Sequence, residues 1–223
     1  MQDEVPEQIQ QFLDIAYNEW STLAGKTLKK VNKYTEWRGK GVSFEWCGGF
    51  VTWCMMEAGI DMLTLDNVEK ETEVSGIAHV KEASVGKIMR GYLERRRTTN
   101  IPQRGFLIVY GENSYNRTVH IGIVYDVQKL DNGKYRITTI EGNMSNRVKM
   151  YVKDYDPSVG SQTGNLSAVP VEERTQEETS YFNYKISSSC KTWYANVFLM
   201  PWIPGDTSDT AQPEVSVTPA PEG

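Results

Sequence analysis

Cysteine and histidine are scarce in this sequence. Its 223 residues include three cysteines, Cys47, Cys54 and Cys190, and two histidines, His79 and His120. Cysteines so few and so scattered do not suit the disulfide framework of a small secreted domain. Two distant histidines also argue against a zinc site, which usually draws its ligands from a cluster of Cys and His. We therefore expect neither a metal ion nor another cofactor.

The sequence also lacks an excess of basic charge and a long apolar run. It has 24 Lys and Arg against 29 Asp and Glu, a formal net charge of −5 at pH 7. Nucleic-acid-binding domains usually carry a clustered basic face, so we expect no nucleic-acid partner. No stretch approaches the ~20 apolar residues of a membrane-spanning helix. The N-terminus, MQDEVPEQIQ, lacks the basic and apolar regions of a signal peptide. Either the protein is intracellular or a leader is absent from this sequence.

Periodic apolar residues and helix breakers predict helices in the first half of the chain. Within residues 6–20 the apolar side chains recur at the spacing of one helical face: Ile9, Phe12, Leu13, Ala16, Tyr17 and Trp20. A second helix is expected from about Cys47 to Gly59, because glycine commonly ends a helix. Two more helical segments are expected near residues 68–80 and 84–96.

Short β-branched and aromatic segments follow, which predicts strands at residues 105–111, 120–127 and 134–141. The turn LDNG, residues 130–133, joins the last two as a hairpin. Residues 193–203 return as a closing strand. Helices followed by strands favour an α+β domain, in which N-terminal helices pack on an antiparallel sheet.

Two polar stretches bound the expected domain. Residues 157–180 are rich in Gly, Ser and Glu and are typical of a long surface insertion. Residues 205–223 are rich in Pro, Thr and Ser, which is typical of an extended linker or tail. The sequence therefore predicts one domain over residues 1–204, and the tail suggests a separate C-terminal module.

The segment FEWCGGFVTWCMMEAGI, residues 44–60, places Cys47 at the expected start of a helix. The dipole and free N–H groups of a helix N-terminus favour a thiolate over a thiol. A nucleophile is one interpretation, and a buried cysteine in a core helix is the other. Gly48 and Gly49 are poor helix formers. They either let a substrate backbone approach Cys47 and leave its N–H open to an oxyanion, or merely allow tight packing.

A candidate base follows in the strand region. His120 opens one expected strand, and Glu141 and Asn143 project from one face of its hairpin partner. If the hairpin loop centres on residues 130 and 131, Glu141 lies opposite His120. If the turn is at residues 132 and 133, Glu141 slips four residues along and Asn143 lies two residues from His120. The sequence leaves both registers open.

The ordered segments WCGGFVTWCMMEAGI, HIGIVYDV and IEGN resemble the CHAP family, the cysteine- and histidine-dependent amidohydrolases and peptidases. Its members are papain-like enzymes that cleave amide bonds in bacterial peptidoglycan. The resemblance covers roughly residues 9–152, with a weaker likeness in the closing strand. It implies a papain-like α+β fold.

The resemblance also implies roles for the candidate residues. Cys47 would be the nucleophile and His120 the general base and acid. Glu141 would orient the imidazole. Asn143 would assist, either by holding the imidazole or by contributing to the polar wall of the site.

The remaining candidates receive lesser roles. Trp46 and Gly48 are expected to contact the substrate beside the thiol. Cys54, two helical turns after Cys47, is expected to pack in the core, and His79 to be structural. Cys190 is expected to be a spare thiol.

The implied function is a cysteine peptidase or amidase, such as an N-acetylmuramoyl-L-alanine amidase or an endopeptidase. It would act on peptidoglycan outside the cytoplasm, secreted or associated with the cell wall, through a thioester intermediate. One alternative is the papain-like γ-D-glutamyl peptidase family, whose third catalytic member is usually a second histidine or a similar polar group. The other is a cell-wall-binding module that has lost its activity.

Overall fold

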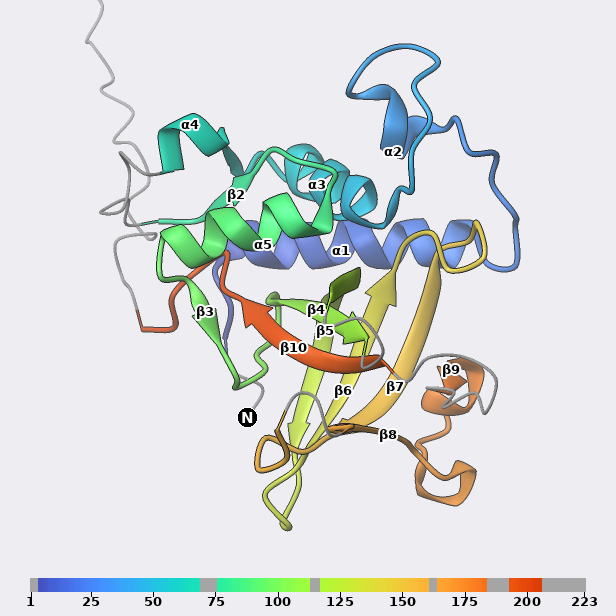
Figure 1. Cartoon of the computed structure of the whole chain (residues 1–223). Helices are drawn as coiled ribbons and strands as arrows, with labels where there is room; N and C mark the ends of the chain where they lie inside the picture. Colours follow the sequence, from blue (N-terminus) through green and yellow to red (C-terminus); the bar gives the residue numbers. More distant parts are fainter. Residues whose placement is uncertain (1–3, 69–75, 113–116, 161–163, 184–192, 206–223) are drawn as a thin grey trace, which may run out of the picture.

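The computed structural model describes residues 4–68, 76–112, 117–160, 164–183 and 193–205. Its helices gather on one side of a β-sheet (Figure 1). The longest are α1 (Glu7–Thr22), α3 (Cys47–Glu57) and α5 (Val85–Glu94), with the short α2 (Lys33–Glu36) and α4 (Leu65–Val68) between them. All three long helices contact strand β5 (Arg117–Lys129). Within the described ranges, no helix combines the length and apolarity needed to span a membrane.

The main sheet is antiparallel along its path, as expected for the predicted α+β class. Among the described residues its strand order is β3 (Thr98–Thr99), β10 (Trp193–Leu199), β4 (Leu107–Glu112), β5, β6 (Tyr135–Glu141), β7 (Lys149–Tyr155) and β8 (Leu166–Ala168). The short β9 (Phe182–Asn183) pairs in parallel with β7. The fold is thus helices packed on an antiparallel sheet, which confirms the predicted class.

The two helices predicted from clear patterns form as expected. On α1 the predicted apolar face is buried at Ile9, Phe12, Leu13 and Ala16. Helix α3 is apolar on nearly all sides, because it is enclosed by α1, α2 and α5 and by the sheet. It ends at Glu57, close to the predicted end, and Gly59 follows with a left-handed φ of +69° that suits glycine. The N–H of Ile60 then bonds the carbonyl of Met55 at 3.0 Å, which satisfies one of the last free carbonyls of the helix.

The helix predicted near residues 68–80 is wrong at its C-terminal end. Residues Ala78–Val80 form strand β2, which pairs in parallel with β1 (Asp61–Leu63). All three β2 side chains are buried. A short apolar run of this kind is compatible with either a buried strand or a helix, and tertiary pairing selected the strand. Residues 69–75 lie outside the described part of the chain.

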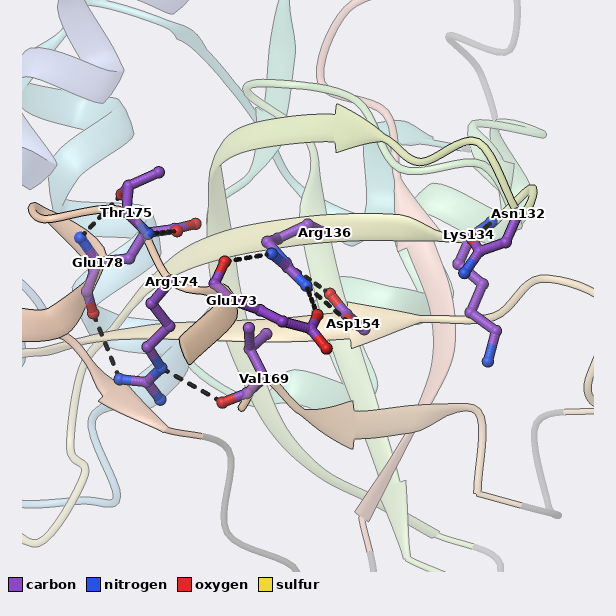
Figure 2. Close-up of polar contacts among 9 residues, drawn as sticks. All are labelled: Asn132, Lys134, Arg136, Asp154, Val169, Glu173, Arg174, Thr175 and Glu178. Carbon is purple, nitrogen blue, oxygen red and sulfur yellow. Dashed lines mark hydrogen bonds and ion pairs between the residues drawn. The ribbon is translucent and has the colours of Figure 1, made fainter. Parts of the chain in front are cut away.

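The segment predicted as a surface insertion adds to the sheet edge. It contributes β8 and two short 3-10 turns, η2 (Val171–Glu173) and η3 (Glu178–Ser180). Asn165 bonds both the N–H and the carbonyl of Ala195 at 2.9 Å, which links the start of β8 to β10. Arg136 of β6 forms paired bonds to Asp154 of β7 and another to Glu173 of η2 (Figure 2). These contacts fasten the segment to the far edge of the sheet. Cys190 and the expected tail at residues 206–223 lie outside the described residues.

Candidate active site

Cys47 is the first residue of α3, as its sequence context predicted. No side chain caps this helix end, and the first turn contains no acidic residue. The first N–H groups of a helix have no partner within the helix, so they are available to an anion at this point. Cys47 is buried at 7% exposure, and Cys54, seven residues on, is completely buried. The two thiols therefore differ in access although they lie on the same helix.

His120 lies on β5, with its imidazole near the Cys47 thiol. It forms a hydrogen bond with Glu141, and Cys47 lies close enough to raise the pKa of the imidazole. The bond to Glu141 joins Nε2 to Oε2 at 3.0 Å, which leaves Nδ1 as the ring nitrogen available to the thiol. The three side chains predicted as nucleophile, base and orienting carboxylate therefore lie together, with a hydrogen bond between the last two. They come from α3, β5 and β6.

The register that brings Glu141 to His120 is neither of the two considered from the sequence. A bulge between Val124 and Asp126 shifts the hairpin pairing, and the ladder ends at Ile123 opposite Ile140. Glu141 then follows opposite Gly122, where a Cβ would lie only 2.8 Å from the Glu141 Cγ. Because Gly122 has no side chain, the Glu141 carboxylate can cross it and reach the histidine two residues away on the same face.

Glu141 is held at its other oxygen by three donors that we did not predict. Its Oε1 accepts hydrogen bonds from the Tyr110 hydroxyl at 2.6 Å, the Thr139 hydroxyl at 2.6 Å and the Lys153 ammonium at 2.7 Å. Both Glu141 and Lys153 are almost fully buried. A buried carboxylate needs such partners, because an unpaired charge inside a protein is very costly. The network leaves Oε2 for the histidine.

The electrostatic environment of His120 favours the protonated form of its imidazole. Burial alone would lower the pKa of His120, but its interactions with Cys47 and Glu141 outweigh burial and raise that pKa to about 9. Burial would also raise the pKa of Glu141, yet the positive charges of Lys153 and His120 hold it well below its usual range. At neutral pH the imidazole is therefore protonated and the carboxylate ionised. An imidazolium is the partner that a catalytic thiolate requires.

Aromatic rings enclose the histidine. Trp193 of β10 stacks on His120 with ring centroids 5.1 Å apart, and the Tyr110 ring lies 5.5 Å away. The strand pattern of residues 193–203 predicted a closing strand, but it carried no signal that its first residue would cover the base.

Asn143 does not reach the histidine. Its Nδ2 donates a hydrogen bond of 2.6 Å to Glu45 Oε2, and its backbone adopts a left-handed φ of +62°. The contact joins the loop after β6 to the segment that precedes Cys47. Of the two roles considered for Asn143, the structure therefore favours the polar wall.

Trp46 and Gly48 are packed inside the protein. Trp46 is fully buried and stacks on Tyr34. A Cβ on Gly48 would lie 2.2 Å from the Ala83 carbonyl oxygen, so the glycine allows the helix to approach that backbone. The same holds for Gly49, where a Cβ would lie 2.5 Å from the Tyr34 carbonyl oxygen. We therefore no longer assign Trp46 or Gly48 to substrate binding.

His79 lies in a separate buried cluster. Its Nε2 lies 3.0 Å from the Thr52 hydroxyl, and its Nδ1 lies 2.9 Å from the Tyr92 hydroxyl. Burial lowers the pKa of His79 to about 3, so it stays neutral. This is the environment of a structural histidine.

A thiol at a helix N-terminus, a histidine on an antiparallel sheet and a polar group behind that histidine make up the site of the papain-like cysteine hydrolases. Residues 37–143 match the family model described as the CHAP domain. The chain therefore carries a CHAP domain, which confirms the predicted family. The match includes Cys47, His120 and Glu141, whereas Lys153 and Trp193 lie outside it. Searches of the curated proteins and of the solved structures found no match. A CHAP domain indicates a hydrolase of the amidase or peptidase kind that acts on peptidoglycan.

Proposed function

We propose that this protein cleaves amide bonds in bacterial peptidoglycan by nucleophilic cysteine catalysis. Cys47 is the nucleophile, His120 the general base and acid, and Glu141 the residue that orients the imidazole. The observations that carry the proposal are the hydrogen bond between His120 and Glu141 and the Cys47 thiol at the start of α3, near enough to His120 to raise its pKa. We also propose that the enzyme acts outside the cytoplasm, where its substrate lies.

The reaction would proceed in two steps. The Cys47 thiolate attacks the carbonyl carbon of the scissile amide, and the free N–H groups at the start of α3 stabilise the oxyanion. His120 donates its proton to the leaving amine, and a thioester remains. The neutral imidazole then accepts a proton from water, which attacks the thioester and releases the acid. Collapse of the tetrahedral intermediate expels the Cys47 thiolate beside the now protonated His120, which restores the resting thiolate–imidazolium pair.

Two observations bear on the alternatives. The third catalytic position is a carboxylate, Glu141, rather than a second histidine, which favours this proposal over a γ-D-glutamyl peptidase. The thiol also lies close enough to His120 to raise the pKa of the imidazole, which favours an enzyme over an inactive cell-wall-binding module.

A turbidity assay on purified cell walls tests the proposal, with mass spectrometry of the soluble fragments to identify the bond. The wild-type protein should clear the suspension and release new amino and carboxyl ends. Cys47→Ala should abolish clearing and keep its circular dichroism spectrum. Cys54→Ala is the matched control, because it removes a thiol from the same helix without touching His120. Equal clearing by Cys47→Ala and the wild type would refute the thiol mechanism.

A further inference from the structure

Lys153 is a buried charged residue that the proposed mechanism does not use directly. It lies on β7 at 1% exposure, beyond the residues that match the CHAP model. Its ammonium bonds the Glu141 carboxylate at 2.7 Å and the hydroxyls of Thr139 at 3.0 Å and Tyr110 at 2.5 Å. A lysine is rarely buried so completely unless it is paired, because desolvation of the ammonium is costly. Its partner here is the carboxylate that orients the catalytic histidine.

The contacts around Lys153 connect several titratable groups, and the charged ones among them alternate in sign. Among the described residues these titratable groups are Cys47 (α3), Tyr110 (β4), His120 (β5), Glu141 (β6), and Tyr151 and Lys153 (β7). Burial raises the pKa of Tyr151, so its ring, 5.2 Å from the Lys153 ammonium, stays neutral. With a thiolate, an imidazolium, a carboxylate and an ammonium, the cluster carries no net charge. Without the ammonium, the same reactive state would leave one negative charge buried.

We propose that Lys153 is a positioning residue that fixes Glu141 behind His120 and whose charge sets the pH range of the reactive thiolate–imidazolium pair. This inference rests on the proposed function, since it concerns the same site. The geometry carries it: Lys153, Tyr110 and Thr139 occupy one carboxylate oxygen and leave the other for the histidine.

The direction of the charge effect follows from electrostatics. Removing a nearby positive charge makes every group in the cluster bind its proton more tightly. In Lys153→Met the thiolate should therefore form only at higher pH. A neighbouring charge at this range shifts such equilibria by about one pH unit or more. The rate of Cys47 alkylation by iodoacetamide at about pH 6 should fall about tenfold, and the acid limb of kcat/KM should move up by about one pH unit.

The experiment compares Lys153→Met with Lys134→Met, using the full chain. Lys134 (Figure 2) is a partly exposed lysine at the hairpin end of the same sheet and pairs with Asp156. Lys134→Met should leave the profile unchanged. The readouts are the rate of Cys47 alkylation from pH 5 to 10, the pH dependence of wall hydrolysis, and the melting temperature. A folded Lys153→Met protein with the wild-type alkylation profile would overturn the inference, because a purely structural lysine would not move that profile.

A second pair of variants decides the question if Lys153→Met does not fold. Glu141→Gln alone removes a negative charge and should move Cys47 alkylation to lower pH, whereas adding Lys153→Met restores a neutral cluster and should move the alkylation profile back toward that of the wild type. A double variant whose alkylation profile equals that of Glu141→Gln alone would show that the Lys153 charge does not set this pH range and would overturn the inference. Alkylation does not depend on the substrate. If the wild type degrades no cell wall but Lys153→Met still shifts the alkylation profile, the proposed function fails and this inference stands.

Discussion

Replacing Gly122 with alanine should disrupt the hydrogen bond between Glu141 and His120 without altering any charged group. A Cβ at this position would lie 2.8 Å from Cγ, 3.3 Å from Cδ and 3.4 Å from Oε1 of Glu141. Real Cβ atoms do not tolerate the shortest of these distances, so the carboxylate must move. Glu141 is held by Tyr110, Thr139 and Lys153 and is buried, so it has no free space to enter. We expect the displacement to break its bond to His120.

The size of the effect can be estimated from that bond. A hydrogen bond to a charged group contributes about 1.5–3 kcal/mol, which corresponds to about 10- to 150-fold in kcat/KM if the imidazole is no longer oriented. The pKa of His120 should also fall from about 9 toward its ordinary value of 6.5, because Glu141 helps to raise it. Overpacking of a core position costs about 1–3 kcal/mol of stability, so the melting temperature should fall but the protein should remain folded.

Histidine NMR isolates this titration. The chain contains two histidines, and His79 has a pKa lowered to about 3, so the signal that titrates in the alkaline range belongs to His120. Gly86→Ala is the matched control. Its Cβ would meet nothing closer than 3.7 Å, and alanine favours the α5 helix. A folded Gly122→Ala protein with wild-type kcat/KM and an unchanged His120 titration would refute the reasoning.

Three further predictions follow from the same site. At about pH 6, iodoacetamide should modify Cys47 well ahead of the fully buried Cys54, and His120→Ala should remove that difference; equal rates would count against a reactive Cys47. The raised pKa of His120 stabilises the fold fully below its ordinary value of 6.5, and this contribution is lost as the pH rises through about 9. The melting temperature should therefore fall across that interval, and a flat profile there would contradict the assigned pKa direction. Thorough chelation should leave hydrolysis intact, since the described residues contain no group of three or more His, Cys, Asp or Glu placed to hold a metal. Loss of activity that only added zinc restores would contradict the thiol mechanism.

The sequence predicted which residues lie together in the candidate site but not the strand register that brings them together. Local pattern sufficed for α3 and for the strands that carry His120 and Glu141, because helix ends and short β-branched runs are encoded locally. The register between those strands was not predictable, because the bulge between Val124 and Asp126 leaves no clear local signal. Gly122 was the available clue. A glycine inside a strand often marks a place where another group approaches closely.

The burial of Lys153 and of Trp46 could not be predicted from the sequence, for two different reasons. A lysine in a strand is expected to face solvent, so nothing local indicated that Lys153 would be buried against Glu141. Trp46 was favoured for the substrate because it precedes the thiol, yet it is fully buried against Tyr34. Proximity along the chain does not determine which side of a helix end a ring will occupy.

The site divides into a reactive part and a supporting part that come from different stretches of the chain. The residues that we propose as nucleophile, base and orienting carboxylate lie within the residues that match the CHAP model. The groups that hold them in place include Lys153 on β7 and Trp193 on β10, which lie beyond that match. Because β7 pairs with β6 and β10 pairs with β4, the strand pairing places Lys153 and Trp193 on the face of the sheet that carries His120. The residues proposed to react could therefore be recognised by family resemblance, whereas the residues that contact and support them had to be found from the sheet geometry.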